Sequence, residues 1–387
     1  MGETNRRQFL QQAAVAGAAA PWIVGQARAA DDTGPQFLIR SSRPLDAETP
    51  VEVFDQFLTP NRLFFVRSHF GPPVVGLSPW TLAIDGMVDR PVTLDLDALK
   101  PVPAATLPAV LQCSGNGRAL FRPQPPGVAW EKGAVGNAAW GGVPLADLLR
   151  RAGVQPGAGH VHLHAADGPP NPRTPAYFRS IPLDRAMDPS TLIATTMNGE
   201  PLPWLHGGPI RLVVPGWSGN HWIKWLRRIT VARDEAQGFY MQTGYKIPKT
   251  PAPPGVDVKP ADQVSVTTLN LKSLIARTHD GARLAPGAHE VRGVAWTGGD
   301  ARVTRVEVAV GPEGGPAPVW KDATLVGESK PYAWRQWTAT WNAPQPGRYL
   351  IQSRATDSTG AVQPETGTWN KSGYLWNAID RVTREVL

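Results

Sequence analysis

Short apolar stretches, broken by glycine and proline, dominate the chain between residues 35 and 260. Stretches of this length with turn residues at both ends are typical of strands. The strands that we expect on this basis are 80–84, 104–111, 160–164, 210–214 and 229–231. Helical spacing of apolar positions is confined to two short pieces, 145–152 and 183–187. The pattern predicts an irregular α+β domain in this part of the chain.

A proline-rich stretch, 247–255, separates this region from a second pattern. Beyond it, apolar runs recur at short intervals, with glycine turns at 297–299 and 358–360. The runs are 264–269, 289–296, 303–310, 318–325, 336–341 and 349–355. Short strands at such a spacing predict an immunoglobulin-like β-sandwich. We therefore expect two domains, at 30–255 and 256–387.

The first thirty residues have the character of a targeting signal. Arg6 and Arg7 precede a stretch of small residues at 13–25, and Ala-Arg-Ala follows at 27–29. This order is that of a bacterial export signal, and the arginine pair indicates the route that carries folded proteins. We expect removal of 1–29 and a periplasmic location. Beyond the signal, no stretch approaches twenty uninterrupted apolar residues, so we expect no membrane span.

Composition and charge narrow the possible ligands. The hydrophobic content is 42%, and 40 prolines and 39 glycines favour strands and irregular loops over long helices. The net charge of +7 falls to +5 without the signal, which favours anionic ligands or acidic partners. Lysines and arginines are scattered rather than gathered in a stripe, which argues against a nucleic-acid partner.

Cys113 is the only cysteine in the sequence. A lone buried thiol is most often a small hydrophobe, but this one opens a Gly/Asn turn, 112–118, after an expected strand. Glycines let a bulky ligand approach the backbone, and the nearby Arg118 favours the thiolate. A thiolate suits a soft or high-valent transition metal. A lone cysteine also cannot form a Cys-x-x-Cys-His attachment, so we expect no haem.

Several segments occur in the order found in one known family. They are Phe-Val-Arg-Ser-His at 65–69, Cys-Ser-Gly-Asn-Gly-Arg at 113–118, Ser-Ile-Pro-Leu at 180–183, Met-Asn-Gly-Glu-Pro-Leu-Pro at 197–203, His-Gly-Gly-Pro-Ile-Arg at 206–211, Val-Pro-Gly-Trp at 214–217 and Ile-Lys-Trp-Leu at 223–226. Together they resemble the sulfite oxidase family of molybdopterin oxidoreductases, most closely its haem-free periplasmic sulfite dehydrogenases. The resemblance implies a sulfite-oxidase-type molybdopterin-binding domain followed by an immunoglobulin-like dimerisation domain, in agreement with the two patterns above.

The resemblance also implies roles for individual residues. Cys113 is similar to the cysteine that binds molybdenum, and Tyr245 to the tyrosine beside the metal. Arg67, Arg118 and Trp130 match the pocket that takes the substrate anion. The positions that hold the pterin and its phosphate are matched by His69, Asp167, His206, Arg211 and Lys224.

One departure lies near the C-terminus. Vertebrate-type members of the family carry an arginine in their Trp-Asn segment, where this chain has Ser372. Lys371 is the neighbouring cation, and whether it replaces that charge is left open by the sequence. The departure bears on substrate affinity more than on the type of reaction.

The implied chemistry agrees with the residue types. A small dianion such as sulfite needs two or more guanidinium groups, whose planar forks hold its oxygens. The Tyr245 phenol is a suitable proton shuttle. We therefore expect molybdenum-dependent oxidation of sulfite to sulfate. The electrons should pass to an external c-type cytochrome, and the chain should form a homodimer.

Other functions remain open at this stage. A sulfane-sulfur dehydrogenase subunit lies in the same family, whereas the methionine sulfoxide reductase branch lacks a C-terminal sandwich. From other classes come a zinc hydrolase and a carbohydrate-binding protein. His160, His162 and His164 share one face of a strand, a spacing that suits zinc. Fifteen tryptophans would suit a sugar-binding surface, although core packing explains them as well.

Overall fold

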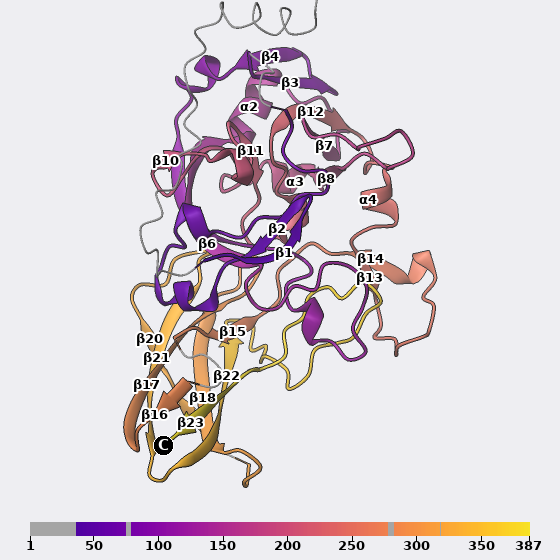
Figure 1. The fold of residues 1–387 in the computed structure, drawn as a ribbon. Helices are drawn as coiled ribbons and strands as arrows, with labels where there is room; N and C mark the ends of the chain where they lie inside the picture. The colour runs from indigo at the N-terminus through magenta and orange to yellow at the C-terminus, as the bar shows by residue number, and fades with distance from the viewer. Residues whose placement is uncertain (1–35, 75–78, 278–281, 318) are drawn as a thin grey trace, which may run out of the picture. The chain divides into compact units, whose positions relative to one another are not determined.

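The computed structural model describes residues 36–74, 79–277, 282–317 and 319–387. The expected signal at 1–29 lies outside these residues. Two five-stranded sheets, one antiparallel and one mixed, form the first part of the fold (Figure 1). The first sheet has the strand order β10-β9-β6-β5, with β11 also paired to β9. The strands of this sheet are β5 (Ala105–Gln112), β6 (Val135–Pro144), β9 (Leu192–Met197), β10 (Glu200–Pro201) and β11 (Arg211–Val213).

The second sheet has the order β4-β3-β12-β7-β8, in which only β3 and β12 run parallel. Its strands are β3 (Thr81–Gly86), β4 (Val92–Asp95), β7 (His160–Ala165), β8 (Phe178–Pro182) and β12 (Leu226–Ala232). Strands at four of the five expected positions in this half, 80–84, 104–111, 160–164 and 229–231, are confirmed with shifted ends. The fifth, 210–214, shortens to β11.

Helices are few and short. The expected helix at 145–152 is α2 (Leu145–Ala152), which begins after Pro144 and ends at Gly153 with a φ of 74°. Proline before a helix and a left-handed glycine after it are the usual boundary signals. The expected helix at 183–187 is the single turn α3 (Leu183–Ala186), and α4 (Phe239–Gln242) was not expected.

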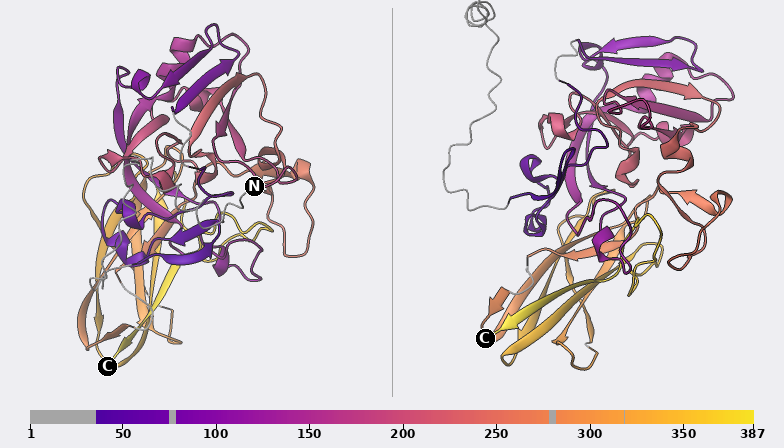
Figure 2. Two further views of the ribbon diagram at one scale, coloured as in Figure 1. Left: turned by 45° about the horizontal axis from the view of Figure 1, so that its top comes forward. Right: turned by 45° about the vertical axis from the view of Figure 1, so that its right-hand side comes forward.

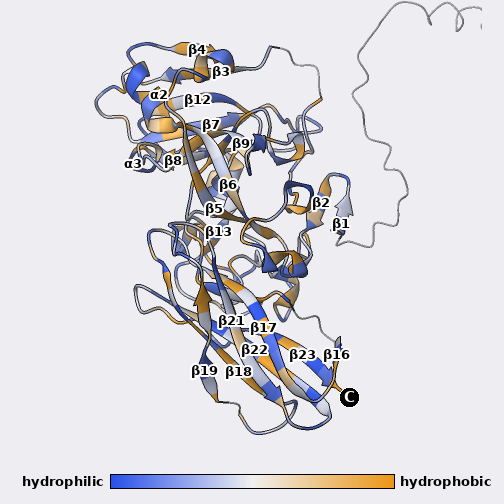
Figure 3. Ribbon diagram, turned by 90° about the vertical axis from the view of Figure 1, so that its left-hand side faces the viewer, coloured by the Kyte–Doolittle hydropathy of each residue, from blue (hydrophilic) through white to orange (hydrophobic). Residues whose placement is uncertain are grey.

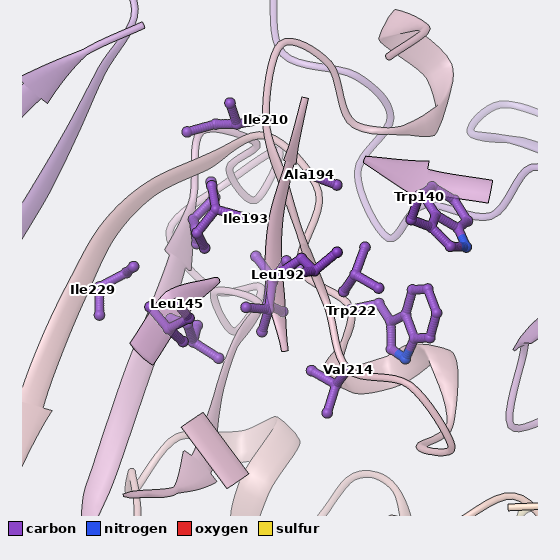
Figure 4. Packing of buried hydrophobic residues seen from close by; sticks show 14 of the residues in the cluster. Trp140, Leu145, Leu192, Ile193, Ala194, Ile210, Val214, Trp222 and Ile229 are labelled. Atoms are coloured by element: carbon purple, nitrogen blue, oxygen red, sulfur yellow. The ribbon is translucent and has the colours of Figure 1, made fainter. Parts of the chain in front are cut away.

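One hydrophobic core joins the two sheets. The Trp140 ring on β6 meets the Trp222 ring edge to face, with 5.5 Å between ring centroids (Figure 4). Figure 4 also shows Leu192 and Ile193 of β9 beside Leu145 of α2. All five side chains are at most 2% exposed. This core fixes the loops that leave the ends of β5 and β11.

The C-terminal region is the expected β-sandwich, with sheet orders β15-β17-β21-β20 and β16-β23-β22-β18-β19 (Figure 2). Its strands are β15 (Lys272–Ile275), β16 (Ala282–Leu284), β17 (Gly287–Trp296), β18 (Val303–Pro312), β19 (Trp320–Asp322), β20 (Thr324–Val326), β21 (Arg335–Ala343), β22 (Gly347–Asp357) and β23 (Asp380–Val386). Buried and more exposed residues alternate along β22 and β23, and Figure 3 shows hydrophilic and hydrophobic stretches mixed along the strands of the sandwich. Trp337 and Trp341 lie in the core between the sheets, so these two tryptophans are packing residues.

Two expectations for this region need correction. The single strand expected at 318–325 is two strands, β19 and β20, which pair in different sheets; residue 318 lies outside the described residues. The strand expected at 264–269 ends early, as β14 (Gln263–Ser265), because the chain beyond it bridges to Trp217. β14 pairs with β13 (Lys246–Pro248), so the proline-rich stretch forms the loop of a hairpin.

Among the described residues, no helix is both long enough and apolar enough to cross a membrane.

Candidate active site

A cavity whose lining residues come from the segment 65–245 is bordered by eight of the ten predicted site residues. It holds about 720 Å³ of empty space, counting the part that is open to solvent. The predicted residues that line it are Arg67, His69, Cys113, Asp167, His206, Arg211, Lys224 and Tyr245.

Cys113 reaches the cavity from the turn that follows β5. Its N–H donates to the Ala134 carbonyl at 2.9 Å, and its carbonyl accepts from the Asn116 N–H at 3.0 Å. Gly117 has a φ of 93°, and a Cβ at this position would lie 2.5 Å from the ring of Trp376. The turn therefore depends on a glycine here, and it holds the thiol at the end of a rigid strand.

Two guanidinium groups act on the thiol. Burial raises the pKa of Cys113, and the charges of Arg118 and Arg67 oppose that rise. Arg67 lines the cavity itself, with its Nη1 3.2 Å from Oδ1 of the buried Asp46. The thiol thus lies in an environment that favours the thiolate once a metal replaces the proton.

Tyr245 and His69 form a neutral hydrogen-bonded pair in the cavity wall. The Tyr245 hydroxyl lies 3.0 Å from His69 Nε2. Burial raises the pKa of Tyr245 well above its usual value, so the phenol keeps its proton. Burial, together with the charges of Arg67 and Lys224, lowers the pKa of His69 well below its usual value. The pair can pass a proton without placing a charge in the cavity.

Arg211 and Lys224 bring positive charge to the cavity, and neither has a carboxylate partner among the described residues. Arg211 is 3% exposed, and its Nη1 and Nη2 donate to the carbonyls of His206 at 2.8 Å and Trp222 at 2.9 Å. Lys224 Nζ donates to the Leu205 carbonyl at 3.1 Å. Burial lowers the pKa of Arg211 to about 9 and that of Lys224 to about 7.

The remaining titratable groups do not neutralise this charge. Burial lowers the pKa of His206 to about 4, so the imidazole is neutral. Asp167 is the one carboxylate that lines the cavity in the described part of the chain, and burial raises its pKa to about 6. Three basic side chains, those of Arg67, Arg211 and Lys224, line the same cavity as this single carboxylate. The cavity therefore favours an anion.

These residues fit a large cofactor that carries both a phosphate and a soft metal. A buried guanidinium without a carboxylate, such as that of Arg211, is costly unless an anion binds to it. Planar guanidinium forks hold phosphate oxygens well. The Cys113 thiol supplies the ligand that a soft or high-valent metal prefers.

Arg118 and Trp130 do not line the cavity. The Nε of Arg118 donates to the Ser372 carbonyl at 3.0 Å, and its Nη1 donates to the Val128 carbonyl at 2.9 Å. Arg118 is nevertheless close enough for its charge to oppose the rise that burial causes in the pKa of Cys113. Trp130 is fully buried in the hydrophobic core. Their place in a substrate pocket stays a prediction.

The C-terminal departure from the family pattern adds no charge to the cavity. Lys371 is exposed and pairs with Asp257 at 2.8 Å, and it does not line the cavity. Ser372 offers only its backbone carbonyl to Arg118. Neither residue takes the place of the arginine that the resemblance leads one to expect.

Sequence reasoning missed Tyr177 and Asn220, which also line the cavity. The Tyr177 hydroxyl donates to the Asn220 carbonyl at 2.6 Å, and its ring stacks on that of His69 at 4.0 Å. Both residues orient the wall around the Tyr245–His69 pair. The only sequence signal for Tyr177 is its position three residues ahead of the 180–183 segment.

The three histidines of β7 do not form a metal site. His162 Nε2 lies 2.8 Å from the Asp234 carbonyl, and His164 stacks on Phe178 at 5.1 Å. In the part of the chain that the structure describes, no three His, Cys, Asp or Glu side chains are grouped to hold a metal.

Comparisons with known proteins agree with this geometry. Residues 69–240 match the family described as "Oxidoreductase molybdopterin binding domain", and residues 263–386 match the "Mo-co oxidoreductase dimerisation domain". The second match supports a homodimer. The chain is 36% identical over 365 residues to sulfite oxidase of Gallus gallus, with 90% of this chain and 77% of that protein aligned.

Two further relatives extend the comparison. Mitochondrial sulfite oxidase of Rattus norvegicus is 36% identical over 374 residues, and the alignment covers 91% of this chain but only 66% of the rat protein. The crystal structure of the sulfane dehydrogenase SoxCD from Paracoccus pantotrophus superposes with a TM-score of 0.77 at 26% identity. That superposition covers 98% of this chain and 96% of the solved chain.

Proposed function

The chain belongs to the sulfite oxidase family, and from this premise we propose that it oxidises sulfite to sulfate with a molybdenum–molybdopterin cofactor. One observation carries the proposal: the cavity brings together a soft thiol, an anion-binding guanidinium and a proton-carrying phenol, those of Cys113, Arg67 and Tyr245. When bound, the cofactor supplies two-electron redox chemistry at the metal. The overall reaction takes an oxygen atom from water and releases two electrons and two protons.

In this proposal the cavity residues divide into two groups. Cys113 holds the metal, while Arg211 and Lys224, with the neutral His206 beside them, hold the phosphate of the cofactor. Asp167, which lines the same cavity, would contribute to holding the pterin. The cofactor anion would also offset the charge of Arg211, which has no ion-pair partner among the described residues, and would add to the effect of Asp167 and Asp46 on Lys224.

The second group acts on the substrate. Arg67 would bind the sulfite oxygens through its planar fork and leave the sulfur lone pair free to react. Tyr245 and His69 hold or move one of the released protons along their 3.0 Å hydrogen bond. Arg118 contributes a second positive charge from behind Cys113, and Trp130 supports the wall as a packed residue.

The proposal also covers the location of the protein and its electron acceptor. The Arg6–Arg7 signal supports export to the periplasm by the twin-arginine route. The lone Cys113 supports a chain without a c-type haem, so electrons pass to an external c-type cytochrome. Replacing both arginines with lysine should trap the precursor in the cytoplasm, as cell fractionation would show; normal periplasmic accumulation would contradict this.

A second candidate is oxidation of sulfane sulfur within a larger complex. The superposition on SoxCD over nearly the whole of both chains favours it. The two candidates share the cofactor and the cavity but differ in substrate. Because Lys371 and Ser372 add no further cation, the cavity does not require a small dianion.

The deciding experiment measures reduction of cytochrome c by the purified, molybdenum-loaded protein. We expect reduction with sulfite and about one molybdenum per chain. The Cys113→Ser variant, purified in parallel, should give no reduction. Faster reduction with thiosulfate than with sulfite would favour the second candidate. A protein free of molybdenum and inactive with both anions would contradict both.

A further inference from the structure

The segment 369–376 crosses from the sandwich to the turn that carries Cys113. The Leu375 N–H donates to the Ser114 carbonyl at 2.9 Å, and the Trp376 ring meets Phe121 edge to face at 4.8 Å. Asn370 braces the segment, because its Oδ1 accepts the Tyr374 N–H at 3.0 Å and its Nδ2 donates to the Tyr374 carbonyl at 2.8 Å. The backbone of Tyr374 is therefore fixed from both sides.

The ring of Tyr374 lies between two groups of the proposed site. It is parallel to the Tyr245 ring within 10°, with 5.3 Å between the centroids. The Arg118 guanidinium lies 5.4 Å from the Tyr374 centroid. The Tyr245 ring is in turn 5.3 Å from the guanidinium of the fully buried Arg179. These contacts form a series of cation, ring, ring and cation, in which each neighbour attracts the next.

Tyr245 needs such support because its backbone is strained. Its φ is 56°, a left-handed conformation that is costly for an aromatic residue and persists only when its surroundings impose it. Three other rings approach it within 6.4 Å, but none is parallel to it. Among the described residues, Tyr374 makes both the shortest ring contact of Tyr245 and the only stacked one.

Tyr374 is close to the site without facing into it. Burial raises the pKa of its hydroxyl, the charges of Arg118 and Arg67 oppose that rise, and the Cys113 thiolate adds to it. The hydroxyl is thus within electrostatic reach of all three groups. Tyr374 does not line the cavity; instead it lines a separate cleft beside the β13–β14 hairpin. Contact with a bound substrate is not required for it to act.

We propose that Tyr374 is a positioning residue for the sulfur-anion site. Its ring sets the spacing between Tyr245, which handles the proton, and Arg118, which attracts the anion. The inference rests on the proposed function for the identity of the anion, a sulfur oxyanion. Without the ring, Tyr245 can leave its left-handed conformation and Arg118 loses one face of its packing, so both turnover and anion affinity should fall.

The test compares three variants with the wild type in the loaded protein. In Tyr374→Leu the stack is lost, and kcat/KM for sulfite should fall about tenfold, with a matching weakening of sulfate binding by calorimetry. In Tyr374→Phe the ring remains and only the hydroxyl, with its hydrogen bond to the Tyr245 backbone, is lost, so both values should return to within about threefold of wild type. Lys371→Ala, an exposed change in the same segment, should leave both values unchanged.

Molybdenum content and melting temperature should match in all four proteins, which separates positioning from loss of fold or cofactor. If Tyr374→Leu does not fold, Tyr374→Met, which fills a similar volume without a ring, replaces it with the same expectation. Wild-type kcat/KM and sulfate binding in a folded ring-less variant would overturn the proposal. Equal losses in the Phe and Leu variants would overturn it too, because the hydroxyl would then be the active group. If the wild type oxidises neither sulfite nor thiosulfate, the proposed function fails, and the sulfate titration alone decides on Tyr374.

Discussion

Two buried charges, Glu307 in the β-sandwich and Arg211 in the cavity, are compensated in opposite ways. In the sandwich, the carboxylate of Glu307, a residue that is 5% exposed, accepts two hydrogen bonds from Arg354, at 2.9 and 3.1 Å, and pairs with Arg305 at 3.2 Å. In the cavity, Arg211 is buried to a similar degree but donates only to backbone carbonyls. A buried charge that is already paired serves the fold. One that lacks a counter-charge marks a place where an anionic ligand completes the structure.

Replacement of Cys113 should give the largest effect. Mutation of a residue that only orients a metal ligand lowers metal affinity or activity by about 10–100-fold. Loss of the ligand itself should therefore lower activity further. In Cys113→Ser, sulfite oxidation should fall below about 1% of wild type while the fold persists, because no disulfide is lost. Circular dichroism provides the fold control. Unchanged turnover in the folded variant would show that the thiol is only structural.

Arg67 tests the substrate half of the cavity. Arg67→Gln removes a charge-assisted hydrogen bond to the anion, worth roughly 1.5–3 kcal/mol, so kcat/KM for sulfite should fall about 10–150-fold. Asp46 would be left without its partner at 3.2 Å, so Asp46→Asn is the matched control for that lost ion pair. Steady-state kinetics decide the matter: a loss of equal size in Asp46→Asn would assign the effect to the ion pair instead of the anion.

Arg211 and Arg354 should respond to the same substitution with opposite signs. Arg211→Leu removes a buried cation that lacks a counter-charge, so the cofactor-free protein should become more stable, by up to about 1–4 kcal/mol, while molybdenum loading falls. Arg354→Leu leaves Glu307 with fewer donors and should destabilise the protein by roughly 1.5–3 kcal/mol without changing the loading. Urea unfolding and metal analysis measure both quantities. Destabilisation of the cofactor-free protein by both changes would break the comparison.

Elements of the fold that have local sequence signals could be predicted, whereas elements that depend on pairing with distant strands could not. The helix at 145–152 has its ends marked by Pro144 and Gly153, so local chemistry determines it. β6 (Val135–Pro144) was missed because its three glycines resemble a turn, although it lies buried between β5 and β9. β23 (Asp380–Val386) was missed because charged residues, Asp380 and Arg384, occupy two of its four buried positions, which obscures the alternation of apolar and polar residues. Only pairing with β22 reveals it as a strand.

Site residues that lie in conserved-looking motifs could be predicted, whereas their partners across the fold could not. Cys113 and Arg118 stand in one continuous segment; Cys113 lines the cavity, and the charge of Arg118 acts on its thiol. Tyr177 and Tyr374 belong to no motif, and long-range packing alone brings them to Tyr245. The segment 369–376 was noted for its missing arginine, yet its main contribution is a ring and a carbonyl.

The smallest expected effect is a pH dependence of the cofactor-free protein. Lys224 has a pKa of about 7 in the folded chain, against an ordinary value of 10.5, because burial disfavours its charge. Between these values the unfolded chain binds more protons than the folded one, so stability should rise as the pH increases from 7 to 9. Below pH 7 both states are protonated and the contribution of Lys224 stays constant.

A phosphate beside Lys224 would raise its folded pKa and remove this slope. Lys272, which is buried in the sandwich region with a pKa of about 7, titrates in the same window, but it should do so equally with and without the cofactor. The difference between loaded and cofactor-free protein therefore isolates the cavity. We expect the melting temperature of the cofactor-free protein to rise by a few degrees from pH 7 to pH 9 relative to the loaded protein. In Lys224→Met, where no group remains to titrate, that difference should shrink. Parallel pH profiles for the loaded and cofactor-free wild type would mean that no anion binds beside Lys224, and that its missing counter-charge has nothing to do with the cofactor.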